Sequence, residues 1–344
     1  MDVTSRRLAA QGLSGSNLRD PRAVTGRLLA IQAQDPRGAR LAVRARLSES
    51  ARNPGASAVD RALNDRSLAI GWLNRGTLHL VLAEDYRWLA ELTAPRLMTS
   101  NQTRLRQEGV SPGDADKGVE RICRRLADGP ATRAEIKEEL ESAGVPVAGQ
   151  ALVHILFLAC LRNRIMRGPM AGKEQAFVLI EDWLGKPEPV DREAALAELA
   201  RRYLAGHGPA TDRDLAKWAG IPLGQTRQGL EAIASELKEA GDLIELKERS
   251  RPGKEEPGAR LLGSFDPILH GWESREWIVP DEAQRAVVTT NGIFRPTIFA
   301  RGEVIGTWKL ASGRFELNPF NEPDPGEAKA LEREMERVRE YLGQ

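Results

Sequence analysis

Two glutamines separated by one residue, Gln32 and Gln34, have the spacing in this chain that best suits chemistry. Residues at i and i+2 point to opposite sides of an α-helix but to one face of an extended strand. Because Pro36 disfavours helical geometry at Asp35, we expect the preceding helix to end within this stretch and the two amides to converge. An amide is neither a strong base nor an acid, but it can hold a water molecule and place a carbonyl dipole beside a developing positive charge. The alternative is that both amides satisfy the end of a helix.

Arginines crowd the stretch that follows the glutamines, at Arg37, Arg40, Arg44 and Arg46. The whole chain has a net charge of only +1, but its first 127 residues hold 21 Lys+Arg against 13 Asp+Glu, and the remainder holds 29 against 36. This segregation allows a local positive field. Guanidinium groups in such a field would suit the phosphates of a nucleic acid, and contacts of this kind position a protein without reading sequence. The alternative is a solvated face of a helix or strand.

The length of 344 residues predicts two or three domains, and the composition is ordinary for a soluble protein. No apolar run approaches the roughly 20 residues of a membrane span, and the N-terminus lacks the apolar region of a signal peptide. Cys123 and Cys160 lie in apolar helical patterns, which favours small core residues of a reducing cytosol. The four histidines show no metal-ligand spacing. We therefore expect a cytoplasmic protein without a metal, a cofactor or membrane contact.

An internal repeat organises the middle of the chain. Residues Gly129–Ile136 recur as Gly208–Leu215, and in both copies a threonine, Thr132 or Thr211, precedes an acid by three residues. This spacing is the signature of a helix capping box. A glycine-containing turn, a second helix and a strand-like stretch follow each copy. One unit used twice, a helix-turn-helix with a wing, accounts for the pattern.

The second helices and the wings of the two copies are expected at corresponding places. The helices are His154–Leu161 and Gln225–Leu237, and the wings are Ile165–Ile180 and Leu243–Leu262, the latter with its tip at Arg251–Lys254. The helix His154–Leu161 is apolar on almost every side, and the helix Gln225–Leu237 carries glutamates around its basic residues. Neither therefore resembles the groove-reading helix of a repressor.

The sequence pattern of the N-terminal part predicts a further copy of this unit, which would make three. Asp20 suits the N-cap and Pro21 the first position of one helix, and Val59–Asn64 forms another. The stretch Ser67–Leu82 indicates two strands joined near Asn74–Gly76.

The C-terminal part returns to a β pattern before a charged terminal helix, Glu327–Leu342. Strands are expected at Ala286–Thr290, Pro296–Arg301 and Val304–Leu310. We therefore predict an α+β fold, mainly α, with three tandem winged helix-turn-helix units and a β-rich end. The expected boundaries are 1–125, 126–190, 191–262 and 263–344.

Three segments of the chain resemble one known family. They are Leu28–Arg37 (LLAIQAQDPR), Arg75–Leu80 (RGTLHL) and Ser264–Leu269 (SFDPIL). The chain is similar along nearly its whole length to the AlkZ/YcaQ-like proteins, bacterial winged-helix DNA glycosylases that unhook crosslinked or alkylated purines. The Gln-x-Gln signature of the azinomycin-resistance branch falls on Gln32 and Gln34, where the YcaQ branch has Gln-x-Asp. The resemblance implies a C-shaped DNA cradle and catalytic roles for both glutamines.

The implied activity agrees with what two amides can do. Cleavage of an N-glycosidic bond passes through an oxocarbenium-like sugar, which glycosidases usually stabilise with carboxylates. Amides suffice only for a base that already leaves easily, such as a cationic N7-alkylated purine. No lysine stands near the motif in sequence to form a Schiff base, so we expect a monofunctional hydrolase. Asp35 is the neighbouring carboxylate and either assists or serves the turn.

The implied partner is double-stranded DNA with alkylated or crosslinked purines, bound by a monomer in the nucleoid. Arg75, Thr77 and His79 lie on the hairpin of the first unit, where a wing could enter a groove. A structural turn is the alternative for this segment. Two other functions stay open, a non-catalytic regulator and a catalytically silent DNA-binding member. The lesion, and whether it is a crosslink or a monoadduct, is also open.

Overall fold

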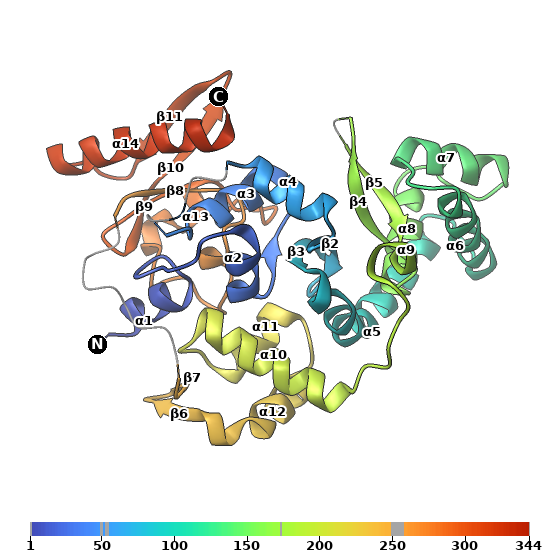
Figure 1. The fold of residues 1–344 in the computed structure, drawn as a ribbon, viewed down its shortest axis with the longest axis horizontal. Coiled ribbons are helices and arrows are strands. Elements are labelled where there is room, and N and C mark those ends of the chain that lie inside the picture. The colour runs from blue at the N-terminus through green and yellow to red at the C-terminus, as the bar shows by residue number, and fades with distance from the viewer. Residues whose placement is uncertain (1, 49–50, 52–54, 173, 249–257, 344) are drawn as a thin grey trace.

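The computed structural model describes residues 2–48, 51, 55–172, 174–248 and 258–343. Three copies of one winged-helix unit follow one another in the chain (Figure 1). The first copy follows a short N-terminal helix, α1 (Val3–Ala10), in the chain. It consists of α2 (Pro21–Leu28), β1 (Ile31–Gln32), α3 (Pro36–Arg44), α4 (Ser57–Asn64), β2 (Leu68–Leu73) and β3 (Thr77–Leu82).

The second and third copies have the same order of elements. The second contains α6 (Pro112–Ala127), α7 (Arg133–Ser142), α8 (Ala151–Leu161), β4 (Ile165–Ala171) and β5 (Glu174–Leu179). The third contains α10 (Arg192–His207), α11 (Asp212–Ala219), α12 (Leu223–Ala232), β6 (Leu237–Ala240) and β7 (Leu243–Leu246). The long helix α5 (Ala83–Gln107) and the short helix α9 (Ile180–Leu184) connect the copies. The prediction of three tandem units is confirmed.

The helix starts follow the predicted caps. Thr132 and Thr211 both form complete capping boxes at the starts of α7 and α11. Asp20 accepts a hydrogen bond from the Ala23 N–H, with Pro21 at the first helical position of α2. Helix α8 is buried along most of its length, which agrees with its apolar sequence and excludes it from reading a groove.

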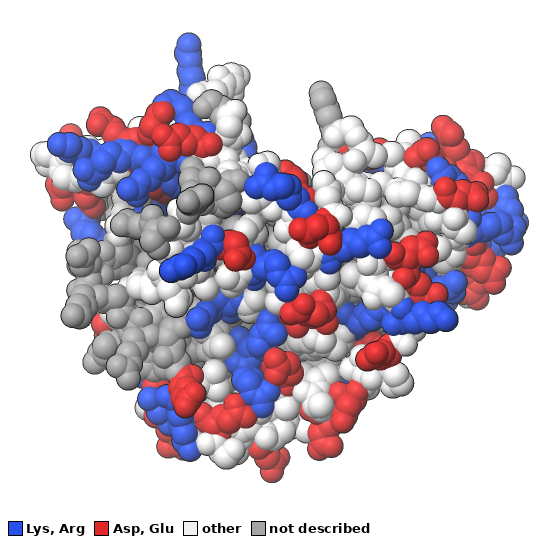
Figure 2. Space-filling view, viewed as in Figure 1, with Lys and Arg blue, Asp and Glu red and all other residues white. Residues whose placement is uncertain are grey.

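One sheet joins the first two units. Its strand order is β1-β3-β2-β4-β5, with β2 meeting β4 where Ile70 lies opposite Arg167. The second unit therefore forms a lobe fastened to the first by this sheet and by α5, and the third unit lies against α5 and α2 (Figure 1). The outline is notched between the β4–β5 wing and the part that contains α4 and α14 (Figure 2). Basic and acidic side chains are interspersed on this face (Figure 2).

The C-terminal part is a four-stranded sheet covered by a helix. The sheet order is β11-β10-β9-β8. Its elements are β8 (Arg260–Leu262), β9 (Thr297–Ala300), β10 (Glu303–Ala311), β11 (Arg314–Pro319) and α14 (Pro325–Leu342). Among the described helices, none is long and apolar enough to cross a membrane.

Two strand predictions were wrong. Arg260–Leu262 was expected in the wing of the third unit, but it is β8 and pairs with β9. Both Leu261 and Leu262 are fully buried, because β8 is enclosed by the C-terminal sheet and its helix, whereas a wing strand exposes one face. Ala286–Thr290 begins in a short helix, α13 (Gln284–Val287), and only the single bridge between Val288 and Phe294 remains β-like. The expected wing tip at Arg251–Lys254 lies outside the described residues.

Candidate active site

Strand β1 carries the first glutamine in the position that links the first and second helices of each unit. In the other two units this position is a single residue, Ala131 or Ala210, bridged to the wing and followed at once by the capping threonine. In the first unit two more residues intervene between Gln32 and the N-cap Asp35. The connection between the first two helices of the unit is therefore longer in the first unit than in the other two, and the additional residues include Gln34 of the Gln-x-Gln motif.

The entry to β1 is a tight, strained turn. Helix α2 ends at Leu28, earlier than expected, and Leu29 adopts φ +65° and ψ −49°. The Ala30 N–H donates to the Leu28 carbonyl at 2.8 Å, which closes a γ-turn of the rare strained kind. Pro36 does not end this helix but starts α3. Strained backbone of this type persists only where its surroundings hold it, commonly beside functional sites.

Gln32 is almost enclosed, yet its amide has no partner. The residue is 4% exposed and lies directly opposite His79 of β3, so the two side chains share one face of the sheet. Within the described part of the chain, the Gln32 amide makes no hydrogen bond. The oxygen and nitrogen of this amide are not fully shielded from solvent, so the unpaired amide remains accessible to water or a ligand.

Gln34 is exposed and holds the edge of the sheet. Its Oε1 accepts a hydrogen bond from the Leu78 N–H at 3.0 Å, while the Ala33 N–H donates to the Leu78 carbonyl at 2.7 Å. Neither glutamine bonds to the end of a helix, so that alternative for the pair is excluded. Asp35 serves as the N-cap of α3 and accepts from the Arg37 N–H at 3.0 Å.

His79 is a buried residue that lies next to Gln32 on the sheet. It is 2% exposed, and burial, with Arg75 nearby, lowers its pKa to about 3. Its Nδ1 lies 2.8 Å from the Thr77 carbonyl and must donate to it, since a carbonyl only accepts. The ring is therefore neutral at pH 7, and it is packed as the alternative for this strand expected, while contact of His79 with DNA stays a prediction.

A loop from the C-terminal part packs against the start of α3, just after the glutamine motif. At Gly38 an added Cβ would lie 2.4 Å from the Ser264 carbonyl oxygen, so the loop runs in direct contact with the start of α3. Farther along the loop, His270 is buried and acts electrostatically on His79. The Nε2 of His270 donates to the Phe265 carbonyl at 2.9 Å. Segments far apart in sequence thus meet around Gln32.

Of the four predicted arginines, only Arg37 is exposed. The guanidinium of Arg40 pairs with Asp60 and donates to the Pro36 carbonyl at 2.7 Å. Arg44 is 10% exposed and forms a bidentate pair with Glu334 at 2.6 and 2.9 Å.

Arg46 is fully enclosed and bonds both oxygens of Asp266 at 2.7 and 2.9 Å. The prediction that Arg44 and Arg46 contact phosphates was therefore wrong. The carboxylates that occupy them lie more than 200 residues away in the chain, so no local pattern revealed them.

Arg75 and Thr77 occupy the hairpin that leads into β3. The Arg75 guanidinium donates to the carbonyls of Lys217 and Trp218 at 3.1 and 2.9 Å, at the C-terminal end of α11, where a cation is favoured. Lys217 therefore meets this hairpin through its carbonyl, while its Nζ donates to the Glu273 carbonyl at 2.6 Å. Contacts of Arg75 and Thr77 with DNA stay predictions.

Acid is expected to destabilise the protein through its buried histidines. His79, His207 and His270 each have a pKa lowered to about 3, mainly by burial, against about 6.5 when unfolded. Between these pH values the unfolded chain binds more protons, so the free energy of unfolding falls as pH falls, by about 1.4 kcal/mol per pH unit and histidine. Urea denaturation from pH 7 to pH 4 measures this slope. A His207→Gln variant should show a shallower slope, and an unchanged slope would contradict the assignment.

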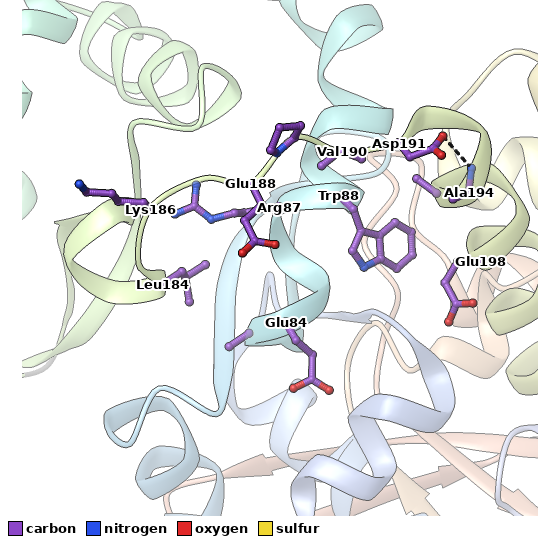
Figure 3. A pocket seen from close by; sticks show the side chains of 13 residues that line it. Glu84, Arg87, Trp88, Leu184, Lys186, Glu188, Val190, Asp191, Ala194 and Glu198 are labelled. Carbon is purple, nitrogen blue, oxygen red and sulfur yellow. Dashed lines mark hydrogen bonds between the residues drawn. The ribbon is translucent and has the colours of Figure 1, made fainter.

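A pocket of about 480 Å³ elsewhere in the protein is not this site. It lies between the starts of α5 and α10 and is lined by Trp88 and by charged side chains of both signs (Figure 3). None of the predicted site residues lines it. Its carboxylates outnumber its cations, so it does not suit a phosphate backbone. In the described part of the chain, no group of three or more His, Cys, Asp or Glu could hold a metal ion.

Comparisons with known proteins agree with this architecture. A family model described as DNA glycosylase AlkZ-like matches residues 25–341. The chain is similar to an interstrand DNA cross-link repair glycosylase of Streptomyces sahachiroi, with 27% identity over 341 residues, 93% of this chain and 90% of the relative. The structure of the Streptomyces sahachiroi DNA glycosylase AlkZ superposes with a TM-score of 0.80 and 25% identity, covering 99% of this chain and 96% of that one. The protein belongs to the AlkZ-like family of DNA glycosylases.

Proposed function

We propose that this enzyme hydrolyses the N-glycosidic bond of N7-alkylated purines in double-stranded DNA, with Gln32 and Gln34 at the reacting centre. The observation that supports this most is the Gln32 amide, 4% exposed and without a hydrogen bond to any described residue. An amide held in a fixed place by a sheet and left unpaired is suited to bind a water molecule or a reacting sugar. The name of the Streptomyces relative extends the proposal to purines in interstrand crosslinks.

The charge of the substrate explains why amides suffice. An N7-alkylated purine carries a positive charge before the enzyme binds it, so it leaves without protonation. The enzyme needs only to place a water molecule and to stabilise the positive charge that moves onto the sugar. The carbonyl oxygen of Gln32 provides a dipole for that charge.

Carboxylates near the motif are engaged elsewhere. Asp35 caps α3 through the Arg37 N–H, and Asp266 is enclosed in its pair with Arg46. The ammonium group of Lys217, whose carbonyl meets the hairpin at Arg75, donates a hydrogen bond to the Glu273 carbonyl. The arrangement therefore favours direct attack by water over a covalent intermediate on lysine. This is the monofunctional mechanism.

A gel assay of abasic-site formation tests the proposed reaction. The substrate is a duplex oligonucleotide with one N7-methylguanine, and alkali cleaves the strand wherever the base has been lost. Wild-type enzyme is expected to yield cleaved product above the spontaneous rate, with a crosslinked duplex as the second substrate. No excess product from either substrate would overturn the proposed function.

Gln34→Ala is expected to lose base excision while DNA binding survives. The substitution removes the Oε1 that accepts from the Leu78 N–H, and the edge of β1 loses a contact with β3. A neutral exposed amide adds little to phosphate affinity, so the Kd for undamaged duplex should stay within about twofold. Single-turnover excision and fluorescence anisotropy measure the two quantities. Equal losses of binding and excision would assign Gln34 a purely structural role.

Arg37→Ala is expected to weaken duplex binding for every sequence alike. Because Arg37 is the exposed member of the arginine group, removing it should lower the dependence of log K on log salt by about one unit. Arg213→Ala, an exposed arginine on α11, is the matched control. Anisotropy titrations at several salt concentrations provide the slopes. If both variants leave the slope unchanged, Arg37 does not contact phosphate.

A further inference from the structure

Phe265 has a backbone conformation that few bulky residues adopt. Its φ is +57°, in the left-handed region where a side chain other than that of glycine is strained. The surroundings hold it there, because its carbonyl accepts from His270 Nε2 at 2.9 Å and its N–H donates to the Phe294 carbonyl at 3.3 Å. The next residue, Asp266, is fixed by the enclosed pair with Arg46. The chain is thus braced on both sides of a strained aromatic residue.

The ring of Phe265 does not serve the core. It is half-buried, and it belongs to none of the hydrophobic clusters of the described residues. Its ring contact is with Phe294, at 5.9 Å between centroids and an interplanar angle of 52°. Phe294 in turn packs on a core cluster and against the His270 ring at 5.4 Å. Phe294 therefore lies between Phe265 and the core. Core packing of Phe265 itself does not explain why its strained backbone is kept.

The loop places Phe265 beside the glutamine motif. Ser264, its neighbour, touches Gly38 at the start of α3, a few residues after Gln32 in the chain. Farther along the loop, His270 lies near enough to His79, the residue opposite Gln32, to contribute to the lowering of its pKa. Phe265 lies between these two residues along the loop. A half-buried aromatic ring therefore stands on a loop that packs against the start of α3, beside the glutamine motif.

We propose that Phe265 is the residue on which the alkylated purine stacks when the enzyme binds its lesion. This inference rests on the proposed function and names a recognition residue for it. Enzymes that act on a base take it out of the helix and hold it against aromatic side chains. An N7-alkylated purine is cationic, and the face of an aromatic ring attracts a cation more strongly than a neutral base. The ring thus favours the lesion over guanine without a hydrogen bond to either.

Lesion preference in binding tests the proposal. The probe is a duplex with one 2′-fluoro N7-methylguanosine, whose sugar resists hydrolysis, compared with the same duplex containing guanine. Wild type is expected to bind the lesion more tightly, and Phe265→Leu to lose roughly 5- to 100-fold of that preference. Phe265→Leu should leave the Kd for undamaged duplex unchanged. Phe265→Trp should retain the preference, since it restores an aromatic face.

Two controls separate stacking from folding. Phe265→Gly relieves the positive φ, so its Tm should match or exceed that of wild type while the preference is lost. Phe265→Leu with an unchanged preference, or Phe265→Gly with a strongly lowered Tm and a retained preference, would overturn the proposal. Because the probe is not cleaved, this result is independent of excision. A protein that prefers the lesion through Phe265 but fails to excise it would contradict only the proposed reaction.

Discussion

Gln32→Ala is expected to lower the single-turnover rate of base excision by about 10²- to 10³-fold, comparable to the loss of one preorganised transition-state contact in other hydrolases. The residue is held on β1 opposite His79, and its amide makes no hydrogen bond to any described residue. Removing it takes away the amide that the proposed mechanism uses as dipole and water site, without breaking a hydrogen bond between described residues. The measurement is the excision rate on the N7-methylguanine duplex with enzyme in excess.

The matched substitutions make this result specific. Gln32→Glu keeps the shape and adds a negative charge beside the sugar, so it should retain more activity than Gln32→Ala. Duplex affinity and Tm should stay near those of wild type for Gln32→Ala, because the side chain is neutral and makes no hydrogen bond to any described residue. Undiminished excision by Gln32→Ala would move the chemistry away from this residue.

Asp266→Asn is expected to destabilise the protein by roughly 3–5 kcal/mol, the usual cost of leaving one member of a buried ion pair without its partner. Both side chains of the pair with Arg46 are completely enclosed, and the pair joins the first unit to the C-terminal loop. The Arg46 guanidinium also donates to Gln11 Oε1 and the Ala42 carbonyl, both at 2.9 Å. Urea denaturation at pH 7 measures the change in the free energy of unfolding.

A double substitution tests whether the cost arises from the unpaired charge. Arg46→Met combined with Asp266→Leu removes both charges and keeps apolar volume, so it should recover much of the stability lost by Asp266→Asn alone. The recovery should be incomplete, because the Ile268 N–H also donates to Asp266. A stability of Asp266→Asn within about 1 kcal/mol of wild type would show that the pair contributes little.

Local sequence patterns determined the helix starts and the repeated unit. A capping threonine, aspartate or proline acts within a few residues, so Thr132, Thr211 and the Asp20–Pro21 pair could be placed from sequence alone. The glutamine pair was also recognisable, because its spacing and its resemblance to a family both lie within one short segment. Its extended backbone at Gln32 followed from the same local rules.

The partners of the arginines could be decided only by the tertiary structure. Arg44 and Arg46 stand in a run that resembles a basic surface, and each is neutralised by a carboxylate from the C-terminal part. A sequence pattern indicates which face of a helix is polar, but it does not indicate which charged residue from a distant part of the chain will form an ion pair with that face. The same holds for β8, which completes a sheet with strands that follow it in the chain.

The composition of the site was decided in the same way. His79 and His270 are separated by almost 200 residues, and their approach depends on how the C-terminal loop packs against α3. Phe265 is an ordinary aromatic residue in the sequence, and its positive φ arises because hydrogen bonds and the Arg46–Asp266 pair hold the loop around it. The sequence by itself determined the three winged-helix units and the residues capable of chemistry. Tertiary packing decided which of those residues share one site, because long-range contacts have no counterpart in local spacing.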